Sequence, residues 1–203
     1  MEQRLVTVVI PKLWPRDEGV TLAQDSLAKQ TYSPIQVLQI LDNEARGANW
    51  ARNQGWRQAQ GEFLLFSDCD CQWEPNAIEI LVGALDRDAK ASYAYCAFKW
   101  TNEDSTGRTV GMGPFTAQTV RNGSVFSTMS LFRAANFPGF DEEIKRLQDW
   151  DLYLTLLERD GRLGVCVPRI LFVTPARPGI SHGGQEPISW QDAVDAVRRK
   201  HQR

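Results

Sequence analysis

Apolar and polar residues form two alternating kinds of pattern along this chain. Short runs of β-branched and other apolar residues predict strands that are buried on both faces, as in the interior of a parallel sheet. Between these runs, apolar residues recur every three to four positions, which predicts helices that cover such a sheet. The expected strands span residues 5–10, 35–41, 63–66, 91–100, 124–132, 163–167 and 170–173, and the expected helices span residues 20–28, 48–59, 77–85, 147–159 and 189–201.

Proline and glycine mark several boundaries of these elements. We expect Pro11 to end the first strand, and Pro168 to separate the last two, because proline cannot donate a hydrogen bond to a neighbouring strand. Gly161 is expected to end the helix before it. Residues 101–123 are rich in Gly, Asn, Asp and Thr and predict a loop. The alternation of strands and helices predicts a single α/β domain over residues 1–203, with a mostly parallel sheet and right-handed crossovers.

Composition narrows the class of protein. The 203 residues are 42% hydrophobic, which is enough for the core of one domain. With a net charge of −2 and a pI near 5.8, the chain lacks the overall positive charge that attracts proteins to nucleic acid or to an anionic membrane. No run approaches the roughly 20 apolar residues of a transmembrane helix, so we expect no membrane span. The four cysteines are too few and too scattered for a disulfide framework, which predicts reduced thiols and a cytoplasmic protein.

The strongest chemical signal is the sequence Asp68-Cys69-Asp70, which directly follows the apolar run Phe63–Phe66. Open α/β sheets bind ligands at the carboxyl ends of their strands. Two carboxylates there would repel each other unless a cation or a hydrogen-bond donor compensates them, so a divalent metal site is one hypothesis. The alternative is that Asp68 caps a turn and Asp70 is solvated.

Several separated segments resemble, in their order along the chain, the inverting family-2 glycosyltransferases of the GT-A fold. They are Ile10-Pro11 at the end of the first strand, Asp42 at the end of the second, Ala51-Arg52-Asn53-Gln54-Gly55, Asp68-Cys69-Asp70, Gly139-Phe140-Asp141-Glu142 and Gln148-Asp149-Trp150-Asp151-Leu152. The resemblance implies a nucleotide-sugar half over about residues 1–100 and an acceptor half over about residues 101–203. It also implies a metal-dependent hexosyl- or pentosyltransferase with a UDP-sugar as its donor.

The resemblance assigns donor-binding roles to four residues. Pro11, Asp42, Arg52 and Asp68 would contact the nucleotide-sugar, and Asp70, with Asp68, would hold Mn²⁺ or Mg²⁺ against the diphosphate. For Asp42 the alternative is a cap at the end of a strand. For Arg52 the alternative is a surface salt bridge.

The acceptor half contains the candidate general base. By resemblance, Asp149 accepts the proton of the attacking hydroxyl, whereas Asp151 has mainly a structural role. The family usually has Glu-Asp here, and this chain has Gln148-Asp149. The alternative is that Asp149 is an acid favoured by the helix dipole. Trp150 is expected in the core.

The chain departs from the family pattern at two places, after Asp42 and after Pro11. Only four residues separate Asp42 from Gly47, where the family has a further helix and strand, so we expect one edge unit to be missing and the nucleotide pocket to be more open. After Pro11, two roles are open for Trp14, stacking on a base or covering the shortened edge. His182, between Ser181 and two glycines, would complete the metal shell by resemblance or is simply solvated.

Two other functions remain open. A sugar-phosphate nucleotidyltransferase uses a related sheet, although the residues after Ile10 lack its Gly-rich loop. A non-catalytic nucleotide-sugar-binding module of the same fold is the other alternative. For a glycosyltransferase the acceptor hydroxyl is undefined and could belong to a glycan, a lipid-linked sugar, a protein or a nucleic-acid base. The basic last helix suits either an anionic acceptor or its own dipole.

Overall fold

The computed structural model describes residues 4–13, 21–102, 106–111, 113–123, 127–161, 163–175 and 188–202. Along the chain the elements are β1 (Val6–Leu13), α1 (Leu22–Leu27), β2 (Ile35–Asp42), α2 (Ala48–Gln58), β3 (Phe63–Phe66), β4 (Gln72–Trp73), α3 (Ala77–Arg87), β5 (Tyr93–Thr101), β6 (Gly107–Val110), α4 (Ala117–Arg121), β7 (Leu131–Arg133), a 3₁₀ turn (Ala134–Asn136), α5 (Gln148–Asp160), β8 (Val165–Pro175) and α6 (Trp190–His201). Among the described residues, no helix is long and apolar enough to cross a bilayer.

The strands of the described residues form one mixed sheet in the order β2-β1-β3-β7-β5-β8-β4, with β6 paired to β5. β1 is parallel to β2 and β3, and β5 is parallel to β8. β7 runs antiparallel to both β3 and β5, so it joins the two parallel groups. β2 is the edge strand, as expected for a chain that lacks one edge unit.

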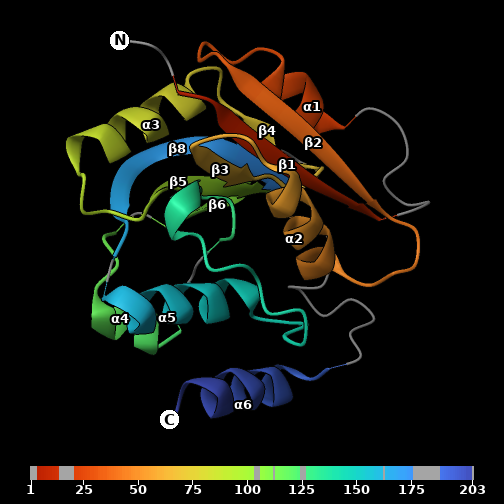
Figure 1. Ribbon diagram of the computed structural model, residues 1–203, viewed down its shortest axis with the longest axis vertical. Helices are drawn as coiled ribbons and strands as arrows, with labels where there is room; N and C mark the ends of the chain where they lie inside the picture. The colour runs from red at the N-terminus through yellow and green to blue at the C-terminus, as the bar shows by residue number, and fades with distance from the viewer. Residues whose placement is uncertain are drawn as a thin grey trace.

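Helices cover both faces of the sheet (Figure 1). Successive side chains of a strand point to opposite faces of the sheet, so each central strand contributes apolar side chains to both faces. In β3, Phe63 and Leu65 belong to one buried cluster, and Leu64 and Phe66 belong to the other. The first cluster packs under α1 and α3. The second packs against α4 and α5, and α6 lies on the outer side of α5 (Figure 1). The architecture is therefore a three-layer α/β/α sandwich with one additional helix.

The expected end of the first strand at Pro11 is wrong. β1 continues to Leu13 and stays in register with β2 over its whole length. Its pairing with β3 ends at Val9, whose carbonyl accepts from the Ser67 N–H at 3.0 Å. Residues two apart in a strand point their backbone groups to the same side, so the nitrogen of Pro11 faces the side that β3 has left. The missing N–H therefore costs no ladder hydrogen bond.

The expected separation of two strands at Pro168 is also wrong. β8 is continuous, and its register against β5 shifts between Cys96 and Ala97 and again between Ala97 and Phe98. An irregularity of this kind accommodates a residue that cannot donate a hydrogen bond.

Three short elements lie where no regular structure was expected. β6 and α4 lie within residues 101–123, and β4 follows the Asp68–Asp70 turn. Each is only two to five residues long, so its pattern carries little periodic signal. The expected helix 20–28 is observed as α1, and the strand expected over 124–132 as the shorter β7; Val20 and Ser124 lie outside the described residues.

Candidate functional site

Asp68 and Asp70 lie on a turn directly after β3, and hydrogen bonds restrain this turn on both sides. The side chains of Phe63–Phe66 are all buried, and the strand ends where the polar residues begin. The N–H of Cys71 donates to the carbonyl of Asp68 at 3.2 Å, which closes the turn. Just beyond it, the Trp73 indole N–H donates to the Ser67 hydroxyl at 2.8 Å. Asp68 and Asp70 thus occupy a short, restrained segment at the carboxyl edge of the sheet, and both are partly exposed.

Arg52 of α2 connects this turn to the start of α5. Its Nη2 donates to Asp68 Oδ1 at 2.9 Å, and its Nη1 lies 3.5 Å from the side-chain oxygen of Gln148. The guanidinium lies 5.5 Å from the ring centre of Phe140. The side chain of Arg52 is only 6% exposed, whereas that of Asp68 is 42% exposed. The surface salt bridge considered for Arg52 is therefore excluded, because its charge is buried at the meeting point of three segments.

Asp149 lies in the first turn of α5, directly after Gln148. Burial raises the pKa of its carboxyl group to about 6, against the opposing effects of a 2.9 Å hydrogen bond from the Trp150 N–H and the nearby charge of Arg52. The negative charge of Asp68 raises this pKa further. A carboxyl group with such a pKa is ionised at neutral pH and remains basic enough to accept a proton.

The residue before α5 has an unusual backbone. Leu147 adopts the left-handed conformation, with φ 61° and ψ 35°. This conformation costs a non-glycine residue roughly 1–2 kcal/mol. Strained backbone next to a candidate base is a signal that the sequence did not carry.

Two asparagines of α2 connect the motifs of the two halves. Asn49 donates through Nδ2 to the carbonyl of Asp141 at 2.8 Å and to that of Ile144 at 3.1 Å. Asn53 donates to the Phe140 carbonyl and accepts from the Phe140 N–H, both at 2.9 Å. Both asparagines are buried. The segments around Ala51–Gly55 and Gly139–Glu142 were identified separately in the sequence, and the structure pairs them.

Asp42 has the contacts of a cap. Its carboxylate accepts from the backbone N–H groups of Glu44, Arg46 and Gly47, at 3.3, 3.0 and 2.7 Å. It is 3% exposed and closes the short loop that replaces the missing edge unit. Pro11, half-buried on the neighbouring strand, pairs with Ile40. The structure thus brings Pro11 and Asp42 onto adjacent strands near the carboxyl edge of the sheet.

The described residues contain no group of three or more His, Cys, Asp and Glu side chains that would enclose a metal. A Mg²⁺ or Mn²⁺ ion that serves a diphosphate uses one or two carboxylates and takes its other ligands from phosphate and water. The partly exposed pair Asp68 and Asp70 fits this type of site. His182 and Trp14 lie outside the described residues.

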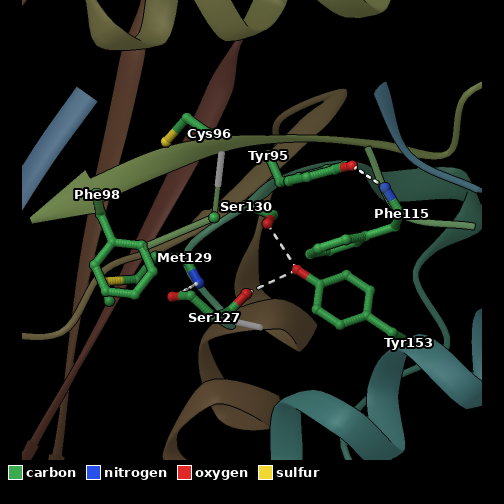
Figure 2. A pocket seen from close by; sticks show the side chains of 9 residues that line it. Tyr95, Cys96, Phe98, Phe115, Ser127, Met129, Ser130 and Tyr153 are labelled. Atoms are coloured by element: carbon green, nitrogen blue, oxygen red, sulfur yellow. Dashed lines mark hydrogen bonds between the residues drawn. The ribbon is translucent and has the colours of Figure 1, made fainter. Parts of the chain in front are cut away.

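A small cavity lies between β5 and α5, one helical turn beyond Asp149. Figure 2 shows the Tyr153 hydroxyl, which donates to the Ser127 carbonyl at 2.7 Å and lies 2.7 Å from the Ser130 hydroxyl. Tyr95 and Phe115 stack with their ring centres 4.0 Å apart. The free volume is about 10 Å³, which is room for about one water molecule. The cavity itself is therefore too small for a sugar ring.

Comparison with known proteins identifies the family. The sequence profile of glycosyl transferase family 2 matches residues 17–142, which is more than half of the chain. The chain belongs to glycosyl transferase family 2. Asp42, Arg52, Asp68 and Asp70 of this family 2 domain lie within the matched region and Pro11 lies just before it, whereas Asp149 and His182 lie beyond it.

One curated relative and several solved structures are similar to the family 2 domain. The Escherichia coli UDP-Glc:α-D-GlcNAc-diphosphoundecaprenol β-1,3-glucosyltransferase WfgD is 25% identical over 128 residues, which are 52% of this chain and 50% of WfgD. The present chain thus spans about half the length of this relative. S. aureus TarS (residues 1–349) with UDP-GlcNAc has a TM-score of 0.73 at 18% identity, over 97% of this chain and 65% of that chain. The corresponding complex with UDP has a TM-score of 0.65, over 85% and 61%. At this identity the likeness shows the fold, and the GT-A architecture is confirmed.

Proposed function

We propose that this domain is a metal-dependent inverting glycosyltransferase that moves a sugar from a UDP-linked donor to an acceptor hydroxyl. One observation carries the proposal: Arg52 contacts both Asp68, at the candidate diphosphate site, and Gln148, the neighbour of the candidate base Asp149. One buried cation thereby contacts the leaving-group site and the residue next to the proton acceptor. A single displacement at an anomeric carbon needs that combination.

Asp149 acts as the general base. Its carboxylate takes the proton from the acceptor hydroxyl while the oxygen of that hydroxyl forms the new bond to the anomeric carbon. The bond from the anomeric carbon to the diphosphate oxygen breaks at the same time, and the electron pair leaves with the diphosphate. The configuration inverts because the two bonds lie on opposite faces of the carbon. A base with a pKa of about 6 can perform this step at neutral pH.

Asp70, assisted by Asp68, would hold a divalent cation, which stabilises the charge that develops on the leaving diphosphate. Arg52 orients the Asp68 carboxylate and contributes a positive charge next to it. Asp42 shapes the nucleotide pocket by ordering the loop over residues 43–47. Its carboxylate also contacts the nucleotide in this proposal.

The printed name of the relative WfgD contains a UDP-glucose donor, and TarS was crystallised with UDP and with UDP-GlcNAc. These names support UDP as the nucleotide of the present donor. WfgD is also named for transfer to a GlcNAc residue on a diphospholipid. We therefore propose a sugar hydroxyl as the first acceptor class to test.

The test measures UDP release from a panel of UDP-sugars, with and without Mn²⁺ and with and without sugar acceptors. We expect metal-dependent turnover that is lost in both Asp70→Ala and Asp149→Asn. Asp25→Asn, which removes an exposed carboxylate of α1, serves as the matched control and should retain activity. Turnover that survives in both site variants would refute the site assignment. Tight UDP binding by calorimetry without turnover on any acceptor would instead identify a non-catalytic binding module.

A further inference from the structure

The carboxyl-terminal helix α6 is docked on α5, the helix that carries Asp149 (Figure 1). Ala193 and Val197 of α6 are buried, and Val197 belongs to the same apolar cluster as Trp150 and Leu154. This contact explains why the helix is amphipathic, but it does not explain the polar residues at its end.

The last turn of α6 inserts two basic side chains against a buried carboxylate. Asp151 is 3% exposed. Lys200 Nζ lies 2.7 Å from Asp151 Oδ1, and His201 Nε2 lies 2.8 Å from the same oxygen. A buried carboxylate that lost these partners would be strongly destabilising, because its charge would be desolvated without compensation. Lys200 and His201 thus contact a buried carboxylate directly, which a general complement to the helix dipole does not require.

His201 is held between two carboxylates. Its second ring nitrogen, Nδ1, lies 2.8 Å from Glu158 Oε2. Each ionised carboxylate can only accept a hydrogen bond, so both ring nitrogens must donate, which requires the imidazolium form. Burial lowers the pKa of His201, but the hydrogen bonds to Asp151 and Glu158 raise it by more. Lys200 and, through Lys200, Asp141 are the other charged groups at this contact.

The contact lies next to the proposed base. Asp151 is two residues after Asp149 in the first turn of α5, and its N–H donates to the carbonyl of the strained Leu147 at 3.1 Å. Lys200 also pairs with Asp141 Oδ2 at 2.9 Å. The carbonyl of Asp141 accepts from Asn49 of α2, the helix that carries Arg52. The end of α6 is thus connected to both elements that form the site.

We propose that Lys200 and His201 are positioning residues that, by neutralising Asp151, hold the first turn of α5 and the carboxylate of Asp149 in place for proton transfer. This inference rests on the proposed function of Asp149. Without the two cations, the buried charge of Asp151 would act on Asp149 from within the same helical turn. The pKa of Asp149 would then rise, and the turn would lose its connection to Asp141.

The first experiment needs no substrate. The chain has two histidines, so a long-range ¹H–¹⁵N spectrum with His201→Gln as the assignment reference isolates the His201 ring. We expect both ring nitrogens to be protonated at pH 7. Hydrogen exchange at the amides of residues 149–152 should accelerate in Lys200→Met but not in Arg199→Met, which removes the same charge from an exposed position of the same helix. A neutral His201 ring at pH 7, or equal exchange in the two methionine variants, would overturn the proposal.

The second experiment uses transfer activity. Lys200→Met should lower kcat about tenfold or more, because small displacements of a base have effects of this size. The KM for the donor should stay within about twofold, since the donor contacts are made by other elements. The acidic limb of the kcat profile should move to higher pH, and Lys200→Arg should restore most of the rate. Identical kcat and pH profiles in Lys200→Met and Arg199→Met would refute the inference.

The two experiments separate failure of this inference from failure of the proposed function. If the wild-type chain turns over no donor, the role of Asp149 is refuted, and with it the catalytic purpose of the contact. The exchange and ring-protonation measurements then still decide whether Lys200 and His201 hold the first turn of α5. If turnover is normal and only the Lys200 effects are absent, the positioning role alone is refuted.

Discussion

The guanidinium of Arg52 lies 2.9 Å from the carboxylate of Asp68, although α2 and the turn after β3 are separate elements. The same side chain reaches Gln148 at the start of α5. Its Nε is buried and has no hydrogen-bond partner among the described residues. The Arg52 side chain is therefore held mainly through its terminal nitrogens Nη1 and Nη2, which contact the two halves of the site.

Arg52→Met should weaken UDP binding about tenfold, as expected for the loss of a charge-assisted contact that orients Asp68. It should also shift the acidic limb of the pH–activity profile to higher pH, because Arg52 lowers the pKa of Asp149. Calorimetry and initial rates measure the two effects. Arg57→Met is the control, since Arg57 lies on the same helix with a half-exposed side chain. Equal behaviour of the two variants would contradict the bridging role.

The activity of the domain should fall on acidification with an apparent pKa near 6, because burial raises the pKa of Asp149 to about 6 and the base must be ionised. Initial rates at saturating donor and acceptor between pH 4.5 and 8 measure this limb. A rate that stays constant down to pH 4.5 would exclude Asp149 as the base.

Asp149→Asn should stabilise the folded domain at neutral and alkaline pH. The folded-state pKa of Asp149 lies above the ordinary value of 3.8. The protonated carboxyl therefore favours folding below pH 4, and this advantage disappears as the pH rises through about 6. Above that pH the neutral amide should gain about 1–2 kcal/mol, which is less than the full shift implies because the Asp149 side chain is half-buried and partly screened by solvent. Urea denaturation of both proteins at pH 4 and pH 8 tests this, and a gain of equal size at both pH values would contradict it.

Gly55→Ala should destabilise the domain by about 1–3 kcal/mol through overpacking. An added Cβ would lie 2.3 Å from Val9 Cγ1, where α2 packs closely against β1. Gly83→Ala is the matched control within a helix, because the added Cβ would meet only the flexible end of Arg87, at 3.4 Å, among the side chains that the structure describes. The control should be neutral or stabilising by up to about 1 kcal/mol. Val9→Ala should recover part of the loss in Gly55→Ala, and an unchanged urea midpoint for Gly55→Ala alone would disprove the close approach.

The sequence alone predicted the helices and strands whose residue pattern depends only on neighbours along the chain. The apolar run Phe63–Phe66, the periodic helices and the helix end at Gly161 were all correct. Burial on both faces gives a continuous apolar run, burial on one face gives a helical period, and glycine favours the left-handed conformation that ends a helix. The expectation that Trp150 is a core residue was also correct; it is 7% exposed and donates to the Val120 carbonyl. All four cysteines lie among the described residues, and the structure places no disulfide between them.

The elements that were missed depend on neighbours that are distant in the sequence. Whether proline ends a strand depends on which side of it is paired, and Pro11 and Pro168 both lie where no partner needs their N–H. β4 and β6 are defined by pairing to β8 and β5 and have almost no pattern of their own.

The sequence by itself determined which residue types are available for catalysis: two carboxylates after a buried strand, an arginine in the next helix upstream, and an acid at the start of a later helix. Only the tertiary structure decided that Arg52 joins Asp68 to the turn of Asp149, that Asp42 caps a loop, and that Lys200 and His201 neutralise Asp151. The physical reason is that charge compensation depends on distance and burial in space. Neither quantity is encoded in the local periodicity that a sequence displays.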